Sequence, residues 1–381
     1  MPIAARIALF YGAFFLVVGI QLPFWPAWLG AHGMSPEQIG LILGFPVWVR
    51  ILTNPLIARA VDATGRRRRM AVALTAMTLA CTSVFLVVDG FWAFLVASTV
   101  ASVFFSAIMP LAENIASMTA LRHGLDYGRM RLWGSVTFIV AASGCGALLV
   151  GRDEDLILWL SLAALGLSVL AALALPEPEM PPRRISNAGI AWLLRDRGFL
   201  AIVAVGALTQ GSHAAFYGFG TIHWRALGIG DDVIGWLWAA GVIAEVGLFV
   251  VSGAMIRRIG PFGMLALSAA AGALRWTVTA WAAEAWVLFL MQPLHAFTFA
   301  AGHTALIWLI ARSVPAEAST TAQALFTSLA LGGSIGLATL GAGWLYERAG
   351  GEVFLAMTAM SLAGGAMIVP LMRAVRGRLA G

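Results

Sequence analysis

The chain contains no lysine, only two cysteines and few charged residues of any kind, and these shortages exclude most classes of soluble protein. Of its 381 residues, 11% are charged and 60% are hydrophobic, whereas soluble domains carry about 25% charged residues. Mean hydropathy is +0.88. Because so little polar surface cannot cover a water-soluble globule of this length, the sequence predicts a protein that lies in a lipid bilayer.

The two cysteines give no sign of redox or metal chemistry. Cys81 and Cys145 lie in apolar segments, which is typical of small packing residues. His295 and His303 are eight residues apart, about two helical turns, and this spacing is unsuited to joint metal ligation. The sequence has neither a nucleophile–base constellation nor a phosphate-binding glycine loop. We therefore expect no cofactor, no metal and no catalytic residue.

Basic charge is carried by arginine alone, and most of it falls in short segments between apolar runs. These segments contain Arg6, Arg66 to Arg69, Arg122, Arg129, Arg183, Arg184, Arg195, Arg197, Arg257, Arg258, Arg312, Arg373, Arg376 and Arg378. They recur after every second apolar run, and the intervening loops carry acids instead. This positive-inside pattern predicts a multi-pass protein of a bacterial inner membrane with both termini in the cytoplasm. A nucleic-acid partner is not expected, because such a protein gathers its basic charge on one soluble face.

The apolar runs predict the number of helices and the domains. A membrane-spanning helix needs about 20 mainly apolar residues and must satisfy its own backbone hydrogen bonds. Twelve segments qualify, at approximately 6–30, 36–60, 69–88, 91–119, 129–150, 156–175, 198–224, 232–256, 262–282, 285–311, 317–345 and 352–372. A proline-rich, charged stretch from Pro176 to Arg184 interrupts them. We predict an N-terminal six-helix bundle at 1–175, a cytoplasmic linker at 176–197 and a C-terminal six-helix bundle at 198–381.

The two predicted halves share a short basic loop. Residues 62–69 follow the second apolar segment, and the glycine- and arginine-containing residues 253–260 follow the eighth. This repetition suggests a duplicated six-helix unit, as in major facilitator transporters. Residues 62–67 resemble the cytoplasmic loop motif of that superfamily, although Ala58 stands where its leading glycine is usual. The resemblance implies that a latch for one conformation is formed by Asp62, Gly65, Arg66 and Arg67. The alternative is a topology signal alone.

Longer stretches narrow the resemblance. Residues 19–29 and 127–135 are similar to lactose permease and its relatives, and residues 210–219, 294–299 and 332–335 with His303 resemble the phenylpropionate permease branch. The resemblance covers essentially the whole chain. It implies an all-α membrane protein with twelve transmembrane helices in two pseudo-symmetric bundles, which transports a small solute by alternating access.

Charges inside the apolar segments are candidates for function, because a charge at the bilayer centre costs roughly 2.5–3.5 kcal/mol or more. Five residues qualify: Arg50, Glu113, Arg131, Glu245 and Arg275. Glu113 and Arg131 flank a short hairpin, so we expect them to face each other. In the lactose permease group, a Glu and an Arg at these motif positions bind substrate. A purely structural salt bridge is the alternative.

Polar residues on predicted helices of the second half extend the candidate site. Gln210, His213 and Tyr217 share one helical face, as do His295 and Thr298 on the tenth segment. Gln323 lies on the eleventh. With Arg275 these stripes indicate a wet substrate cavity at the membrane midplane.

The resemblance also locates the expected proton carrier. Lactose permease has a carboxylate three residues after its tenth-helix histidine, associated with proton coupling, but here Thr298 stands at that position. Threonine cannot titrate, so we expect Glu245 to carry the proton, with Glu113 and His295 as further candidates. A static pairing of Glu245 with Arg275 is the alternative.

These observations predict a monomeric proton symporter that imports a small organic solute such as an aromatic carboxylate. Two buried arginines suit a carboxylate and the many aromatic side chains suit a ring. A sugar or nucleoside symporter and a drug exporter of the same fold are alternatives. A membrane enzyme or a sensor without transport is the alternative from another class.

Overall fold

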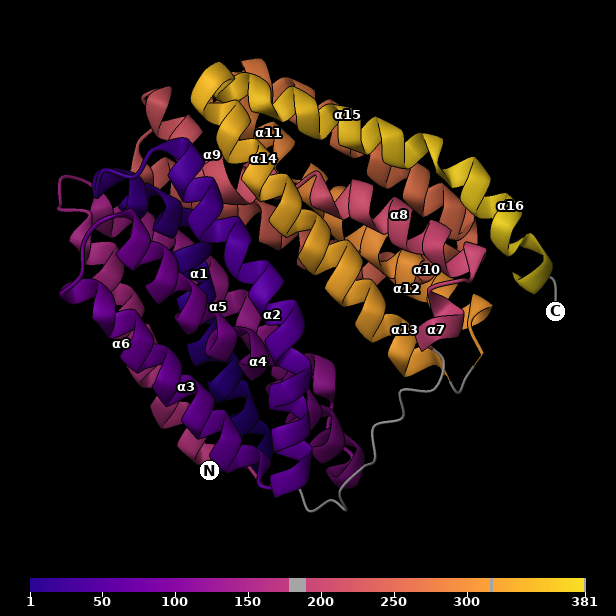
Figure 1. The fold of residues 1–381 in the computed structure, drawn as a ribbon, viewed down its shortest axis with the longest axis horizontal. Helices are drawn as coiled ribbons and strands as arrows, with labels where there is room; N and C mark the ends of the chain where they lie inside the picture. Colours follow the sequence, from indigo (N-terminus) through magenta and orange to yellow (C-terminus); the bar gives the residue numbers. More distant parts are fainter. Residues whose placement is uncertain (178–189, 316–317, 380–381) are drawn as a thin grey trace. The chain divides into compact units, whose positions relative to one another are not determined.

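The computed structural model describes residues 1–177, 190–315 and 318–379, which are almost entirely helical (Figure 1). Ten helical segments of this described part are long and apolar enough to cross a membrane. Two of them, Asp231–Trp281 with 51 residues and Thr321–Leu379 with 59, far exceed one span. Gly260 (φ +68°) interrupts the first, and Gly350 (φ +53°) interrupts the second. The all-α membrane fold is confirmed, and the count of twelve spans stays a prediction.

The chain forms two compact units. Unit 1 comprises Met1–Ile185 and Trp224–Ala239, and unit 2 comprises Ser186–His223 and Ala240–Gly381. Most of the predicted linker lies outside the described residues, since the description stops at 177 and resumes at 190. The proposed domain boundaries at 175 and 198 therefore stay predictions.

Unit 1 contains the first six long helices. They are α1 (Ile3–Ala31), α2 (Pro36–Thr64), α3 (Arg67–Ser83) with the 3-10 turn η1 (Val84–Leu86), α4 (Phe91–His123), α5 (Tyr127–Leu149) and α6 (Asp155–Ala174). Ser35 and Gln38 form a capping box at the start of α2, and Gly65 ends this helix with φ +62°. α1 packs on α5 and α6, and α4 packs on α2 and α3.

A close helix contact inside unit 1 depends on two glycines. A Cβ at Gly146 of α5 would lie 2.2 Å from the backbone oxygen of Asp231, and one at Gly235 would lie 2.4 Å from that of Ala142. Arg225 lies beside this contact and pairs with Glu154 (2.9 Å) and Asp231 (2.7 Å). The start of the helix at Asp231 is therefore fixed against α5 by both packing and charge.

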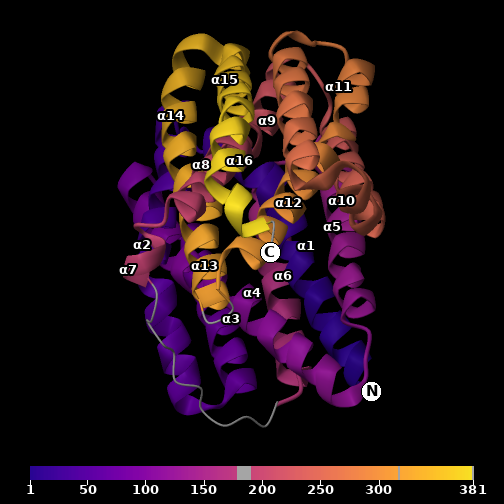
Figure 2. The same cartoon turned by 90° about the vertical axis from the view of Figure 1, so that its right-hand side faces the viewer.

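Unit 2 is built around α8. The helices from residue 190 onward are α7 (Ile190–Leu193), α8 (Arg197–Gly211), α9 (Ala214–Ala226), α10 (Asp231–Trp281), α11 (Ala285–Met291), α12 (Gly302–Ser313), α13 (Ser319–Phe326), α14 (Ser334–Ala349), α15 (Val353–Ala366) and α16 (Ile368–Leu379). Two π-helical segments, η2 (Ala296–Ala301) and η4 (Thr327–Gly333), and a 3-10 turn, η5 (Gly350–Glu352), join some of them. α8 packs on η4, α12, α14, α15 and α16, and Figure 2 shows α16 continuing from α15 to the C-terminus.

Asp196 stabilises the start of α8 and the end of α16 together. Its Oδ1 accepts a hydrogen bond from the Phe199 amide at 2.7 Å and another from Arg378 Nη1 at 2.9 Å. The hydrogen bond from Arg378 is the main reason that the pKa of this carboxyl lies below its ordinary value. A lowered pKa means that the stabilisation is complete above the carboxyl's usual range, near 4, and is lost as pH falls through the native value.

We therefore predict that Asp196→Asn, which keeps a capping side chain and removes the charge, lowers the free energy of unfolding by about 1 kcal/mol at neutral pH. The difference from the unmodified protein should close on acidification, as measured by thermal melting in detergent. Asp126→Asn is the matched control, because Asp126 caps α5 and pairs with Arg129 but both side chains are exposed. A deficit for Asp196→Asn that persists unchanged in acid would contradict this account.

Candidate substrate-binding site

Unit 1 carries one predicted charge pair. Glu113 of α4 lies 3.4 Å from Arg131 Nε of α5, and Tyr127 donates a hydrogen bond to the second Glu113 oxygen at 2.5 Å. The side chains of Arg131 and Glu113 are 31% and 40% exposed, so both remain accessible. The Arg131 guanidinium lies 4.2 Å from the centre of the Phe15 ring. This arrangement offers a cation, an anion and an aromatic face to one ligand.

Unit 2 buries Arg275 of α10 at the centre of a polar cluster. This side chain is 1% exposed. Its terminal nitrogens contact His295 Nδ1 at 3.0 Å and Gln292 Oε1 at 2.9 Å. Its guanidinium contacts two neighbouring aromatic rings, 4.4 Å from the centre of Phe216 and 4.5 Å from that of Trp276. The side chains that hydrogen bond with Arg275 are thus uncharged, and the rings hold its plane in one orientation.

Thr298 joins His213 to the same cluster. His213 Nε2 lies 3.0 Å from Thr298 Oγ1, which is 3.4 Å from a terminal nitrogen of Arg275. His213 Nδ1 contacts the Gln210 carbonyl at 3.0 Å, and its ring stacks on Tyr217 with 5.7 Å between centroids. The two polar stripes expected from the sequence therefore meet.

His295 connects Arg275 to the buried acid. Its Nε2 lies 3.3 Å from a carboxylate oxygen of Glu245. Arginine has no acceptor atom, so His295 Nδ1 must accept from Arg275. A neutral His295 then carries its proton on Nε2 and donates it to Glu245. One imidazole thus links a cation to an acid that can take up a proton.

The local backbone around Thr298 is irregular and directs its side chain toward His213 and Arg275. Thr298 lies in the π-helical segment η2, a form that leaves regular helical hydrogen bonds unmade and is frequent at functional sites. Its carbonyl accepts from Ser268 Oγ at 3.0 Å and from Gln210 Nε2 at 3.3 Å. The π segment thereby ties α8, α10 and the tenth predicted span together.

One predicted binding residue lies apart. Gln323 is exposed on α13, and in the described residues its side chain makes no hydrogen bond with this cluster. Glu113 and Arg131 belong to unit 1, whereas Gln210, His213, Tyr217 and the other candidates of the second half belong to unit 2. The substrate role of these residues stays a prediction.

The candidate latch is a local structure at the turn between α2 and α3. Arg67 Nη2 contacts Asp62 Oδ1 at 3.3 Å, and the Arg67 side chain is 6% exposed. Gly65 supplies the left-handed turn, and Arg66 precedes the first residue of α3. The partner of Asp62 is therefore an arginine of its own loop, and the latch function stays a prediction.

Sequence reasoning missed the aromatic residues that hold the two arginines. The Phe15 ring contacts Arg131, and the Phe216 and Trp276 rings contact Arg275. Aromatic residues are frequent throughout these apolar spans, so their periodicity gives no signal for a role. The one available signal in the sequence was that Trp276 directly follows Arg275.

Charge pairs and buried polar clusters inside bundles of apolar helices are typical of proteins that move polar solutes through a membrane. Fold and clusters together define a multi-pass membrane transporter of small molecules. The profile of the MFS_1 like family, a group of major facilitator transporters, matches residues 4–356. The chain belongs to this family. The predicted resemblance to the superfamily is confirmed, and the protein is a transporter and not an enzyme.

Named relatives cover nearly the whole chain. It is 36% identical over 366 residues to the "Probable 3-phenylpropionic acid transporter" of Escherichia coli (strain K12), which covers 93% of this chain and 94% of that protein. It is 27% identical to the "Maltose permease" of Geobacillus stearothermophilus, with 98% of this chain and 95% of that one covered.

Solved structures share the fold at low identity. The nucleoside transporter NupG superposes with a TM-score of 0.85 and 15% identity, covering 98% of this chain and 100% of NupG. A bacterial homologue of the human lysosomal transporter Spinster, inward-facing and unoccupied, gives a TM-score of 0.77 and 11% identity over 99% of this chain and 97% of its own. These likenesses show the major facilitator fold.

Proposed function

We propose that the protein is a proton-coupled symporter that imports a small aromatic monocarboxylate across a bacterial inner membrane, as a monomer with both termini in the cytoplasm. The observation that carries the proposal is Arg275, a fully buried cation whose hydrogen-bonding side chains are uncharged and whose guanidinium contacts the neighbouring rings of Phe216 and Trp276. A carboxylate would neutralise this cation and a ring would pack on the same aromatic surface. The 36% identical relative named for 3-phenylpropionic acid supports this substrate class.

The ion pair between Glu245 and His295 supports proton coupling. When Glu245 takes up a proton, its attraction for the Nε2 proton of His295 weakens. His295 also contacts Arg275, so protonation changes how firmly the neighbouring cation is held. A substrate carboxylate that binds Arg275 would then bind best to one protonation state of Glu245. Binding and protonation are thereby linked, as symport requires.

A sugar symporter of the same fold is the second candidate. The half-exposed Glu113 carboxylate can accept hydrogen bonds from sugar hydroxyl groups, and the maltose permease is 27% identical. This candidate makes no use of the charge on Arg275.

Uptake into proteoliposomes tests the proposal. We predict that an inward-directed proton gradient drives saturable accumulation of radiolabelled 3-phenylpropionate, at least tenfold above protein-free liposomes. The protein-free control is essential, because the neutral acid diffuses through lipid. A protonophore should abolish accumulation, and excess unlabelled maltose should not compete. Saturable uptake of maltose with none of 3-phenylpropionate would replace the proposal by the sugar symporter.

A further inference from the structure

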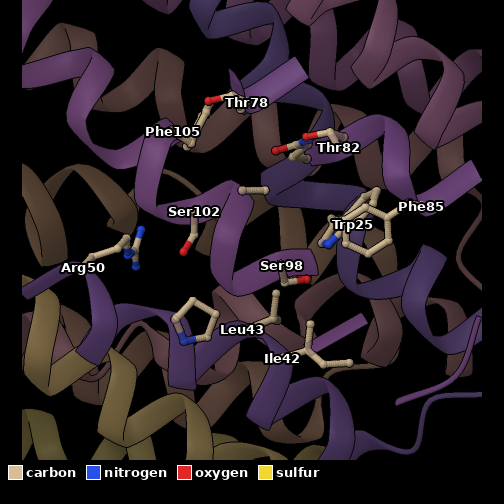
Figure 3. Close-up of a pocket in the computed structure, with 13 residues that line it drawn as sticks. Trp25, Ile42, Leu43, Arg50, Thr78, Thr82, Phe85, Ser98, Ser102 and Phe105 are labelled. Atoms are coloured by element: carbon tan, nitrogen blue, oxygen red, sulfur yellow. The ribbon is translucent and has the colours of Figure 1, made fainter. Parts of the chain in front are cut away.

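Unit 1 contains a cavity that the proposed site does not use. It lies among α1, α2, α3, η1 and α4 and has a volume of about 150 Å³ (Figure 3). Its lining consists of Gln21, Trp25, Ile42, Leu43, Pro46, Arg50, Thr78, Thr82, Phe85, Ser98, Ala101, Ser102 and Phe105. The wall is mostly apolar and carries one charge, that of Arg50.

Arg50 lies at the middle of α2, far from either end of the helix. The helix runs from Pro36 to Thr64, so a side chain at its midpoint cannot extend readily to the membrane surface. Pro46 and Asn54 share its helical face: Pro46 lines the cavity, and Asn54 accepts a hydrogen bond from Ser106 of α4 at 2.8 Å. Arg50 is therefore directed toward α4 and the cavity.

Two polar groups of the cavity wall, on Arg50 and Ser98, lack partners within the described residues, whereas the hydroxyl groups of Thr78 and Ser102 donate to backbone carbonyls. Arg50 has neither an ion pair nor a hydrogen bond in this part of the chain. The Ser98 hydroxyl is buried there without a hydrogen-bond partner. Figure 3 shows the Arg50 guanidinium and the Ser102 hydroxyl turned toward the same space. A half-buried cation without an anionic partner is costly, so an anion in the cavity beside Arg50 would be favoured.

The remainder of the cavity suits one aromatic ring. Trp25 and Phe85 pack edge to face with 5.0 Å between centroids, and Trp25 also stacks on Trp28 at 4.6 Å, so these walls are fixed. Phe105 forms another part of the wall and stacks on Phe14 at 4.9 Å. An apolar cavity of roughly 150 Å³ is known to hold a benzene-sized molecule. A lipid with two acyl chains is too large for this space.

The cavity is separate from the Glu113–Arg131 pair. Phe105 precedes Glu113 on α4 by eight residues, which corresponds to about 12 Å along the helix axis. Neither member of that pair lines the cavity. A ligand here would be held by Arg50 and not by Arg131.

We propose that this cavity is a second anion site, which binds an organic monoanion with its carboxylate on Arg50 and its aromatic ring among Trp25, Phe85 and Phe105. The ligand class rests on the proposed function, but the site does not depend on transport through Arg275. An anionic lipid headgroup offers similar chemistry, and the experiment separates the two sources.

Protection of an introduced thiol tests the site. Ser102→Cys is made in a chain with Cys81→Ser and Cys145→Ser, reconstituted in neutral-lipid nanodiscs and labelled with N-ethylmaleimide. We expect saturating 3-phenylpropionate to slow labelling at least tenfold and the neutral analogue 3-phenylpropanol to leave it unchanged. Adding Arg50→Gln should abolish protection. Arg59→Gln, on an exposed residue of the same helix, should preserve it, and so should Arg131→Ala. Ser98→Cys is a second reporter if the first variant is not monodisperse.

The outcomes separate this site from the proposed function. Protection that persists with Arg50→Gln, or that is lost with Arg131→Ala, overturns the site. Protection produced by phosphatidylglycerol nanodiscs without solute assigns the cavity to lipid and overturns it as well. Uptake of 3-phenylpropionate by the unmodified protein without protection of either thiol refutes the site alone. Protection that requires Arg50, without uptake by the unmodified protein, supports the site and refutes the proposed function.

Discussion

Arg131→Ala should weaken binding of 3-phenylpropionate by about 30-fold or more while the protein still inserts and folds. A hydrogen bond from Arg131 to a charged group of the substrate contributes about 2 kcal/mol, and every 1.4 kcal/mol is a factor of ten in affinity. Folding should suffer little, because the side chains of Arg131 and Glu113 are 31% and 40% exposed and water can solvate the acid that remains. Equilibrium binding to purified protein measures the effect.

Two further substitutions determine what Arg131 contributes. Arg131→Lys should also bind poorly, because lysine keeps the charge but has neither the planar fork nor the stacking on Phe15. Arg129→Ala is the matched control: this arginine lies on α5 two residues earlier and its side chain is 87% exposed. Unchanged affinity in Arg131→Ala, at normal expression, would show that the pair with Glu113 only positions two helices.

Glu245→Gln should remove pH-driven accumulation while leaving exchange of substrate across the membrane intact. Glutamine resembles the protonated carboxyl, still accepts a hydrogen bond from His295 Nε2, and cannot release a proton. The loaded carrier should therefore reorient, but a pH difference should no longer bias its cycle. We expect accumulation to fall to the level of a protonophore-treated sample and counterflow to stay within about twofold of the unmodified protein.

Both quantities should be measured in the same proteoliposomes. Glu284→Gln serves as the control, because Glu284 is exposed at the start of α11 and should affect neither quantity. If Glu245→Gln still accumulates substrate under a pH difference, the proton follows another route, and Glu113 and His295 become the residues to substitute. Loss of both accumulation and counterflow would instead place Glu245 in substrate binding or in folding.

The composition of the site could be predicted well, but its geometry could not. Helical periodicity places Gln210, His213 and Tyr217 on one face, and the structure shows His213 in contact with the other two. The same rule added Gln323 of the eleventh segment to the candidate site; the structure shows it exposed on α13, and its role stays a prediction. A polar residue on a helix face is visible in the chain, whereas the direction of that face depends on how the helix packs.

The partner of Glu245 also could not be predicted, because it depends on how the helices pack. The sequence offered Arg275 as a static partner of Glu245 and gave no means of locating the side chain that contacts this acid. The structure places His295 Nε2 beside Glu245 and His295 Nδ1 beside Arg275, so the imidazole contacts both. This arrangement depends on the π-helical segment η2 that follows His295. A π-helical turn contains one more residue than an α-helical turn, and the hydropathy pattern does not reveal it.

By itself the sequence determined that this protein is a helical membrane transporter, because hydropathy, segment length and motif spacing are local properties of the chain. It also limited the candidate charges to five, since any charge inside an apolar span is costly. Tertiary structure alone decided which of them have partners. Arg131 lies beside Glu113, Arg275 lies among uncharged donors and acceptors, and Arg50 lines a cavity. Such pairing depends on the distance between helices far apart in the chain, and packing of the whole unit sets that distance.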